Sequence, residues 1–202
     1  MRILGVAGSN RKTGNSYLLL KEMFDGFPDI ETRIIQVAEL NIRPCELCFD
    51  LCAQKPFECA VEDDLRMLLD EMKSADGIVF ACPVYCSVPS RFQPVLERIG
   101  CLDYITMEKH GKGLSPLKGK LCALIVVSAG GGFHMSLLRH LHESSLIVGM
   151  RPITPDFWPH IGFFARSGGV QKGAISEQTK VIEQARDLLR SLVAEIEKEG
   201  TG

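Results

Sequence analysis

Short runs of apolar and β-branched residues recur along the chain, separated by segments with a helical period. Three of these runs are almost continuously apolar: Arg2–Ala7, Gly77–Cys82 and Lys120–Ser128. Strands that are apolar on both faces are typical of a parallel sheet, because helices cover both sides of such a sheet. The pattern therefore predicts an α/β fold, a doubly wound five-stranded parallel sheet with helices on both faces.

The remaining elements complete this alternation. Two further strands are expected at Glu31–Val37 and Met150–Thr154. Helices are expected at Ser16–Phe27, Asp64–Lys73, Arg91–Ile99, Met135–Val148 and Glu177–Lys198. The stretch from Asp156 to Gly173 is rich in aromatics and glycine and is expected to be a loop or an arm that contacts a partner. No internal repeat or linker interrupts residues 1–202, so we expect a single domain, with a cysteine-rich insertion at about residues 43–62.

Composition excludes several classes of protein. The chain has 202 residues, of which 46% are hydrophobic and 24% charged, with a formal net charge of −2. This balance predicts a globular protein and gives no polybasic signal for nucleic acid or acidic membrane surfaces. The longer apolar runs fall short of the roughly 20 residues that a membrane span needs. The first residues show no signal-peptide pattern, so we expect a cytoplasmic protein.

A polar loop with the sequence GSNRKTGNS, residues Gly8–Ser16, lies between the first strand and the first helix. Backbone amides in such a turn, together with a helix N-terminus, form an anion site. The loop lacks both the dinucleotide G-x-G-x-x-G spacing and the Gly-Lys-Ser/Thr ending of a nucleoside-triphosphate loop. It therefore favours a monophosphate ligand, and the alternative is a polar helix cap without a ligand.

Four of the eight cysteines, Cys45, Cys48, Cys52 and Cys59, follow a C-x2-C-x3-C-x6-C spacing. In a reducing compartment such a quartet favours metal over disulfides, and a compact run suits an iron–sulfur cluster. A structural zinc site remains an alternative, although zinc usually takes two separated C-x2-C pairs, and the cysteines could also hold no metal. Carboxylates within the segment would hold a cluster at negative potential if they are exposed and ionised.

The chain resembles a known family. GSNRKTGNS is similar to the G-S-x-R-x-x-G-N-S/T loop of the flavodoxin-like NADPH-dependent FMN reductases, and Ala75–Tyr85 is similar to their A-D-G strand ending in P-V-Y. The quartet resembles that of the iron–sulfur flavoproteins in this family, where a C-x2-C-x2-C motif carries a 4Fe–4S cluster. The three residues between Cys48 and Cys52 depart from that pattern, and Gln93 stands where the family usually has Lys.

By this resemblance, FMN would bind at the carboxyl ends of the strands. The residues implied for its phosphate are Ser9, Arg11, Asn15 and Ser16, and Thr13 and Gly14 of the same loop are further cofactor-binding candidates. The residues implied for the ring are Pro83, Val84, Tyr85, Cys86 and Ser87 from the second loop and Ser128, Gly130, Gly131 and Gly132 from the third. His134 is a further candidate flavin neighbour. Cys82 and Cys122 lie in apolar strands and are expected in the core.

The expected function is that of an oxidoreductase containing FMN and an iron–sulfur cluster, with no catalytic side chain. It would transfer electrons between NAD(P)H or a one-electron carrier such as ferredoxin and an acceptor. Three alternatives stay open: an NAD(P)H-dependent FMN or quinone reductase without a cluster, a non-enzymatic electron carrier, and a redox-sensing module. The family implies a homo-oligomer, a dimer or a tetramer, and no nucleic-acid or membrane partner is expected.

Overall fold

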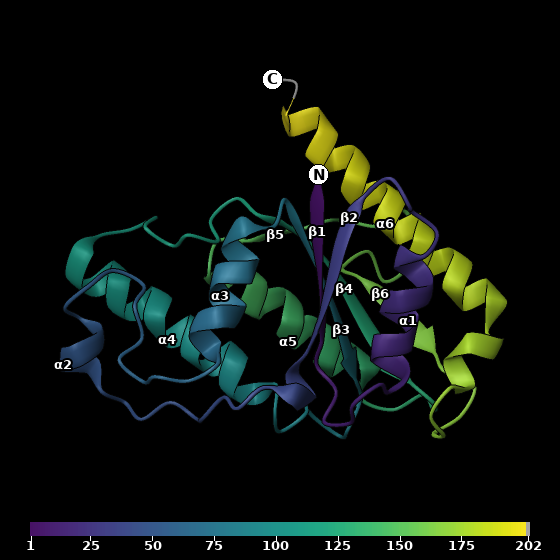
Figure 1. Cartoon of the computed structure of the whole chain (residues 1–202), viewed down its shortest axis with the longest axis horizontal. Coiled ribbons are helices and arrows are strands. Elements are labelled where there is room, and N and C mark those ends of the chain that lie inside the picture. Colours follow the sequence, from purple (N-terminus) through teal and green to yellow (C-terminus); the bar gives the residue numbers. More distant parts are fainter. Residues whose placement is uncertain (201–202) are drawn as a thin grey trace.

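The strands form one parallel sheet in the order β2-β1-β3-β4-β5, with β6 also paired to β4 (Figure 1). The computed structural model describes residues 1–200. The strands are β1 (Arg2–Ala7), β2 (Glu31–Gln36), β3 (Gly77–Pro83), β4 (Leu121–Ser128), β5 (Arg151–Pro152) and β6 (Phe163–Arg166). The order 2-1-3-4-5 is that of flavodoxin-like folds, so the predicted doubly wound α/β fold is confirmed.

Helices cover both faces of this sheet. The longer helices are α1 (Asn15–Phe24), α3 (Leu65–Ser74), α4 (Gln93–His110), α5 (His134–Ile147) and α6 (Thr179–Gly200). The short ones are η1 (Val37–Glu39), α2 (Phe49–Cys52) and η2 (Ala174–Glu177). In Figure 1, α1 and α6 lie on one side of the sheet, and α3, α4 and α5 lie on the other. The chain thus crosses to the second face after α1 and returns to the first before α6, which gives the doubly wound pattern.

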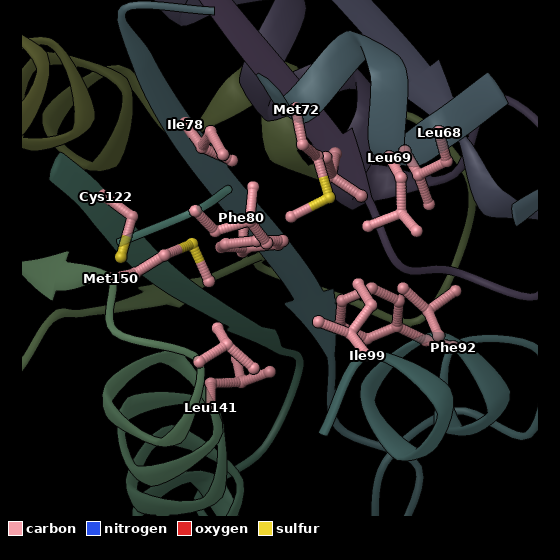
Figure 2. Close-up of a cluster of buried hydrophobic side chains, with 14 of the residues drawn as sticks. Leu68, Leu69, Met72, Ile78, Phe80, Phe92, Ile99, Cys122, Leu141 and Met150 are labelled. Carbon is pink, nitrogen blue, oxygen red and sulfur yellow. The ribbon is translucent and has the colours of Figure 1, made fainter. Parts of the chain in front are cut away.

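Apolar side chains fill the space between the sheet and each helical layer. On the face covered by α3, α4 and α5, Met72, Phe80 and Ile99 are buried together (Figure 2). Cys82 and Cys122 are fully buried in β3 and β4, which confirms their prediction as core residues. Burial raises the pKa of both thiols, that of Cys122 to about 12, so they remain protonated and unreactive at neutral pH.

The fifth position of the sheet differs from the prediction of one strand at Met150–Thr154. Only Arg151 and Pro152 pair there, with the start of β4. The chain then leaves the sheet and returns as β6, which pairs with the second half of β4. The expectation of a loop from Asp156 to Gly173 is therefore wrong at Phe163–Arg166, where the alternating burial of Phe163 and Ala165 supports a short strand.

The fourth helix is also longer than predicted. It was expected to end at Ile99, but α4 continues to His110 because Leu102 and Ile105 keep an apolar, buried face past Gly100. Pro94 lies in its first turn, where a proline disrupts no helical hydrogen bond. Within residues 1–200, none of the helices is long and apolar enough to cross a membrane.

Candidate functional site

A cavity of about 450 Å³ lies at the carboxyl ends of β1, β3 and β4, the edge at which open α/β sheets bind ligands. We call it the carboxyl-end pocket. Its lining residues are Ser9, Asn10, Arg11, Asn15, Ser16, Pro83, Val84, Tyr85, Val127, Ser128, Ala129, Ser167, Gly169 and Val170. The pocket therefore brings together parts of all three loops that the sequence implicates in FMN binding.

One end of this pocket suits a phosphate group. The buried Ser16 hydroxyl has no hydrogen-bond partner among the described residues, and an orphaned buried hydroxyl calls for a polar ligand. Gly14, the N-cap residue of α1, has no side chain to cap the first amides of the helix. A Cβ at Gly14 would lie 3.2 Å from Oγ of Ser9, which is tighter than ordinary van der Waals contact, so glycine leaves room in this cradle. These donors fit a monophosphate.

The other end of the pocket suits a flat aromatic ring. Pro83, Val84 and Val127 provide apolar surface from the ends of β3 and β4. The hydroxyl of Tyr85 lies 3.2 Å from that of Ser9, so the two loops meet between the polar and apolar ends. A pocket with one phosphate-binding end and one apolar end has the distribution of chemistry that FMN needs.

A segment that the sequence did not implicate, residues 167–173, forms the remaining wall. Arg11 donates both of its terminal nitrogens to the carbonyl of Val170, at 3.2 Å each. Asn15 donates to the carbonyl of Gln171 at 3.0 Å and accepts from the amide of Gly173 at 3.0 Å. In the sequence this wall is a polar, glycine-rich loop, SGGVQKG. The loop could not be placed at the pocket in advance, because it follows β6, a strand that the periodicity did not reveal.

Several predicted residues lie beside the pocket without lining it. They are Thr13, Gly14, Cys86, Ser87, Gly130, Gly131 and Gly132. No other atom approaches within 4 Å of a Cβ built at any glycine of the third loop, so that loop leaves open space beside the pocket. His134 is not a lining residue; its ring stacks on Phe164 with centroids 4.1 Å apart.

A second site gathers cysteine thiols between the 45–61 segment and α4. We call it the cysteine pocket, and its lining includes the four predicted ligands Cys45, Cys48, Cys52 and Cys59. The departure from the family spacing has a local explanation. Cys48 precedes α2 and Cys52 ends it, and the amide of Cys52 donates to the carbonyl of Cys48. One helical turn therefore places both thiols on the same face, with their sulfurs 3.8 Å apart.

A fifth thiol, that of Cys101 on α4, also lines the cysteine pocket. The sequence pattern did not group it with the other four, because α4 was expected to end at Ile99, before this residue. Burial raises the pKa of Cys101 to about 11, and the neighbouring Cys45 adds to the rise. Burial likewise raises the pKa of Cys52 to about 11. Metal binding to these thiols must therefore displace their protons.

The donor set of the cysteine pocket fits an iron–sulfur cluster, since thiolates are its usual ligands. The space between the side chains is only about 10 Å³, so the thiols have to move apart to surround a cluster. Among residues 1–200, no three His, Cys, Asp or Glu side chains lie close enough to hold a single metal ion. The four predicted ligands thus line one pocket without being arranged around a metal ion.

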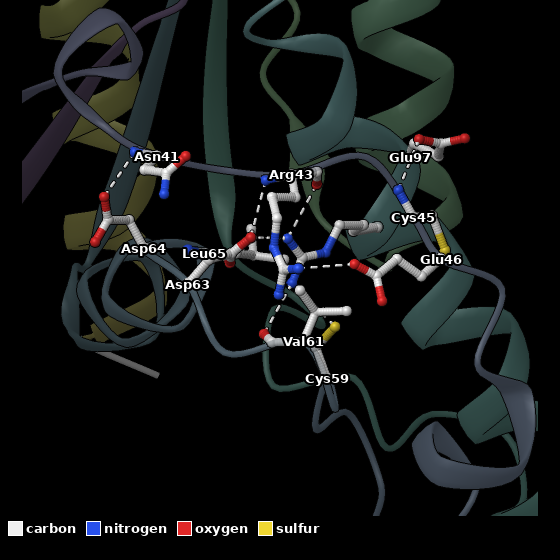
Figure 3. A network of polar contacts seen from close by, with 11 residues as sticks. Asn41, Arg43, Cys45, Glu46, Cys59, Val61, Asp63, Asp64, Leu65 and Glu97 are labelled. Atoms are coloured by element: carbon white, nitrogen blue, oxygen red, sulfur yellow. Dashed lines mark hydrogen bonds and ion pairs between the residues drawn. The ribbon is translucent and has the colours of Figure 1, made fainter.

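A polar network ties the cysteine segment to the rest of the molecule (Figure 3). The amide of Cys45 donates to Glu97 of α4 at 3.3 Å, and Arg43 forms an ion pair with Glu46 at 2.9 Å. At the other end of the segment, the amide of Arg43 donates to Asp63 at 2.9 Å. The two ends of the segment therefore lie side by side.

The chain is similar to a known family and to several known proteins. A family model described as NADPH-dependent FMN reductase matches residues 1–162. An iron–sulfur flavoprotein of Methanocaldococcus jannaschii is 28% identical over 202 residues, covering 98% of each chain. A second, from Archaeoglobus fulgidus, is 36% identical over 105 residues, covering 50% of this chain and 51% of the relative.

Among solved structures, FerB of Paracoccus denitrificans, a flavoenzyme NAD(P)H:(acceptor) oxidoreductase, aligns with a TM-score of 0.61 at 18% identity, over 96% of this chain and 97% of that one. At this identity the likeness shows the fold alone. The similarity to iron–sulfur flavoproteins that the motifs indicated is thus confirmed over the whole chain by the first relative.

Proposed function

The chain belongs to the NADPH-dependent FMN reductase family and is an FMN-dependent oxidoreductase, and from this premise we propose that it transfers electrons between FMN in the carboxyl-end pocket and a 4Fe–4S cluster in the cysteine pocket. The electrons come from NAD(P)H, in keeping with the family, or from a one-electron carrier such as ferredoxin. The electrons are then transferred to an acceptor. We also propose a cytoplasmic location, where thiols stay reduced.

In this proposal the chain's own residues bind and orient the cofactors. The hydroxyls of Ser9 and Ser16 and the first amides of α1 hold the phosphate, and Pro83 and Val84 pack against the ring. When bound, FMN exchanges electrons in pairs or singly, and an iron–sulfur cluster exchanges them singly. No side-chain nucleophile is required, so catalysis rests on placing the two groups and on tuning their potentials.

One observation carries the proposal: four cysteines that are close in sequence converge, with Cys101, on a single pocket of an FMN reductase fold. Coincidental core cysteines would not explain this convergence, because Cys45, Cys48 and Cys59 are only partly buried. Relatives named iron–sulfur flavoproteins support the same assignment.

The test is to purify the protein without oxygen, reconstitute the cluster, and quantify iron, acid-labile sulfide and FMN alongside visible and EPR spectra. The substitution Cys48→Ala is expected to abolish binding of iron and sulfide and to leave FMN bound. The matched control is Cys122→Ala, which removes a core thiol that does not line the cysteine pocket and should retain all three. Wild-type protein without iron after reconstitution would contradict the proposal.

Kinetic measurements distinguish the proposed function from the alternative, a reductase without a cluster. The carboxyl-end pocket is complete without the cysteine segment, which favours this rival as the second candidate. If iron-free protein oxidises NADPH as fast as the reconstituted protein, the cluster has no part in the reaction. If neither NADH nor NADPH reacts and only reduced ferredoxin delivers electrons, the protein is an electron carrier.

A further inference from the structure

Arg98 is a fully buried arginine beside the cysteine pocket. Its side chain, on α4, has an exposed fraction of 0% and is among the largest of the completely buried side chains. Burying a guanidinium is unfavourable unless its hydrogen-bond donors are satisfied and its charge is paired. The hydrogen-bond partners of Arg98 therefore indicate which parts of the chain it stabilises.

Those partners lie on both sides of the cysteine segment. One terminal nitrogen donates to the carbonyl of Arg43 at 3.1 Å and also to the carboxylate of Asp63. The other donates to the carbonyl of Val61 at 3.2 Å. Arg43 precedes the first cysteine of the segment and the other two residues follow the last, so one side chain clamps the two ends of the segment together.

The second terminal nitrogen also donates to the sulfur of Cys59, at 3.1 Å. A positively charged donor stabilises a thiolate and, in a cluster, stabilises the form that carries one more negative charge. In addition, Nε of Arg98 is buried without a partner among the described residues, so it offers one more donor at the edge of the pocket that Arg98 lines.

We propose that Arg98 is a positioning residue for the iron–sulfur cluster: it closes the cysteine segment and, through its hydrogen bond to Cys59, raises the reduction potential of the cluster. The inference rests on the proposed function. This hydrogen bond opposes the carboxylates of the segment, which would lower the reduction potential of the cluster. Two of them, Glu46 and Glu58, are already paired with Arg43 and Lys55. The potential is then set mainly by the hydrogen bond from Arg98 to Cys59 rather than by these exposed acids.

The test compares Arg98→Met and Arg98→Lys with wild type, after anaerobic reconstitution. Loss of such a supporting contact typically lowers metal affinity by about 10–100-fold, so Arg98→Met should hold much less iron and sulfide per FMN. The cluster that remains should have a midpoint, followed by EPR, that is shifted to more negative potential. Arg98→Lys, which keeps the charge but not the fork of donors, should fall between the two. Arg66→Met, which removes an exposed arginine near the same segment, is the control and should leave both readouts unchanged.

Because Arg98→Met leaves Asp63 buried without its partner, the double variant Arg98→Met/Asp63→Leu is measured as well. It removes both charges and avoids an unpaired buried carboxylate, so a shifted midpoint is expected there too. Wild-type midpoints in a folded Arg98→Met or double variant, with FMN and far-UV circular dichroism intact, would overturn the inference. A wild-type protein that takes up no iron or sulfide would instead overturn the proposed function, and this inference with it.

Discussion

Cys101 occupies the cysteine pocket together with the four ligands that the sequence predicts. A 4Fe–4S cluster takes four thiolates, so one of the five has to remain free. The quartet lies on a segment that can rearrange, whereas Cys101 is fixed within α4. We therefore expect Cys101→Ser to retain its iron and Cys59→Ser to lose it, as measured by iron and sulfide per FMN. A Cys101→Ser variant without iron would show that α4 supplies a ligand.

The ion pair between Asp63 and Arg98 predicts how stability depends on pH. Burial opposes ionisation of Asp63, but hydrogen bonds from Arg98 and from the amides of Arg43 and Leu65 outweigh it, so the pKa of Asp63 is lowered. A lowered native pKa adds stability above the unfolded value of about 3.9, and this stability is lost as pH falls through the native value. Breaking one partner of a buried pair costs about 3–5 kcal/mol.

Asp63→Asn should therefore be less stable than wild type by about this amount at pH 7, and the difference should narrow only below about pH 4. Urea unfolding followed by far-UV circular dichroism measures it, on protein freed of iron so that acid loss of the cluster does not contribute. Asp187→Asn is the control, since its ion pair with Arg190 is exposed and worth at most about 1 kcal/mol. A constant difference down to pH 3 would contradict this account.

At the scale of elements, the start of α1 and the 167–173 segment form one unit through Asn15. Its side chain makes hydrogen bonds to the carbonyls of Gly169 and Gln171 and from the amide of Gly173. Asn15→Ala should release this wall of the carboxyl-end pocket. Each lost hydrogen bond contributes about 0.5–1.5 kcal/mol net. The FMN dissociation constant should therefore rise about tenfold or more.

Quenching of FMN fluorescence measures this affinity, and limited proteolysis reports the release of the 167–173 segment. Asn41→Ala, at an exposed residue that does not line the pocket, should change neither. If Asn15→Ala binds FMN as tightly as wild type, then the 167–173 segment is not part of the site.

Elements with strong periodicity could be predicted from the sequence, and those defined by tertiary contacts could not. β1, β3 and β4 are apolar along almost their whole length, so their patterns revealed them. β6 has four residues and is recognisable only by its pairing with β4. The same applies to the candidate site. The four cysteines of the quartet are close in sequence, so their spacing indicated the site. Cys101 and Arg98 reach the quartet only through the length and packing of α4. Gly100 made this helix appear shorter in the sequence than it is.

At the scale of the whole molecule, the two proposed cofactor pockets lie apart. The carboxyl-end pocket and the cysteine pocket share none of their described lining residues. In Figure 1, α2 lies at the outer end of α4, well away from the strands. The layer of α3 and α4 thus separates the cysteine segment from the sheet of its own chain. A second copy that presents its carboxyl-end pocket to this segment would shorten the electron path.

The surface around the cysteine segment suits such an interface. Leu47 and Leu51 have exposed fractions of 63% and 55%, and Phe49 and Tyr104 are exposed as well, an apolar group of the kind that marks an interaction site. We expect a homodimer or homotetramer whose contact includes this surface. The double variant Leu47→Glu/Leu51→Glu should shift the protein towards monomer in size-exclusion chromatography with light scattering, because it buries charges in the contact.

The same variant should slow the transfer of electrons from reduced FMN to the cluster, followed by rapid-mixing absorbance, while leaving iron and FMN contents unchanged. Leu114→Glu, at an exposed apolar residue outside the cysteine segment, should alter neither association nor rate. The rate in the double variant should also rise with protein concentration, since mass action restores the contact. A monomeric wild type that reduces its cluster at a rate independent of concentration would show that the electrons cross the α3–α4 layer within one chain.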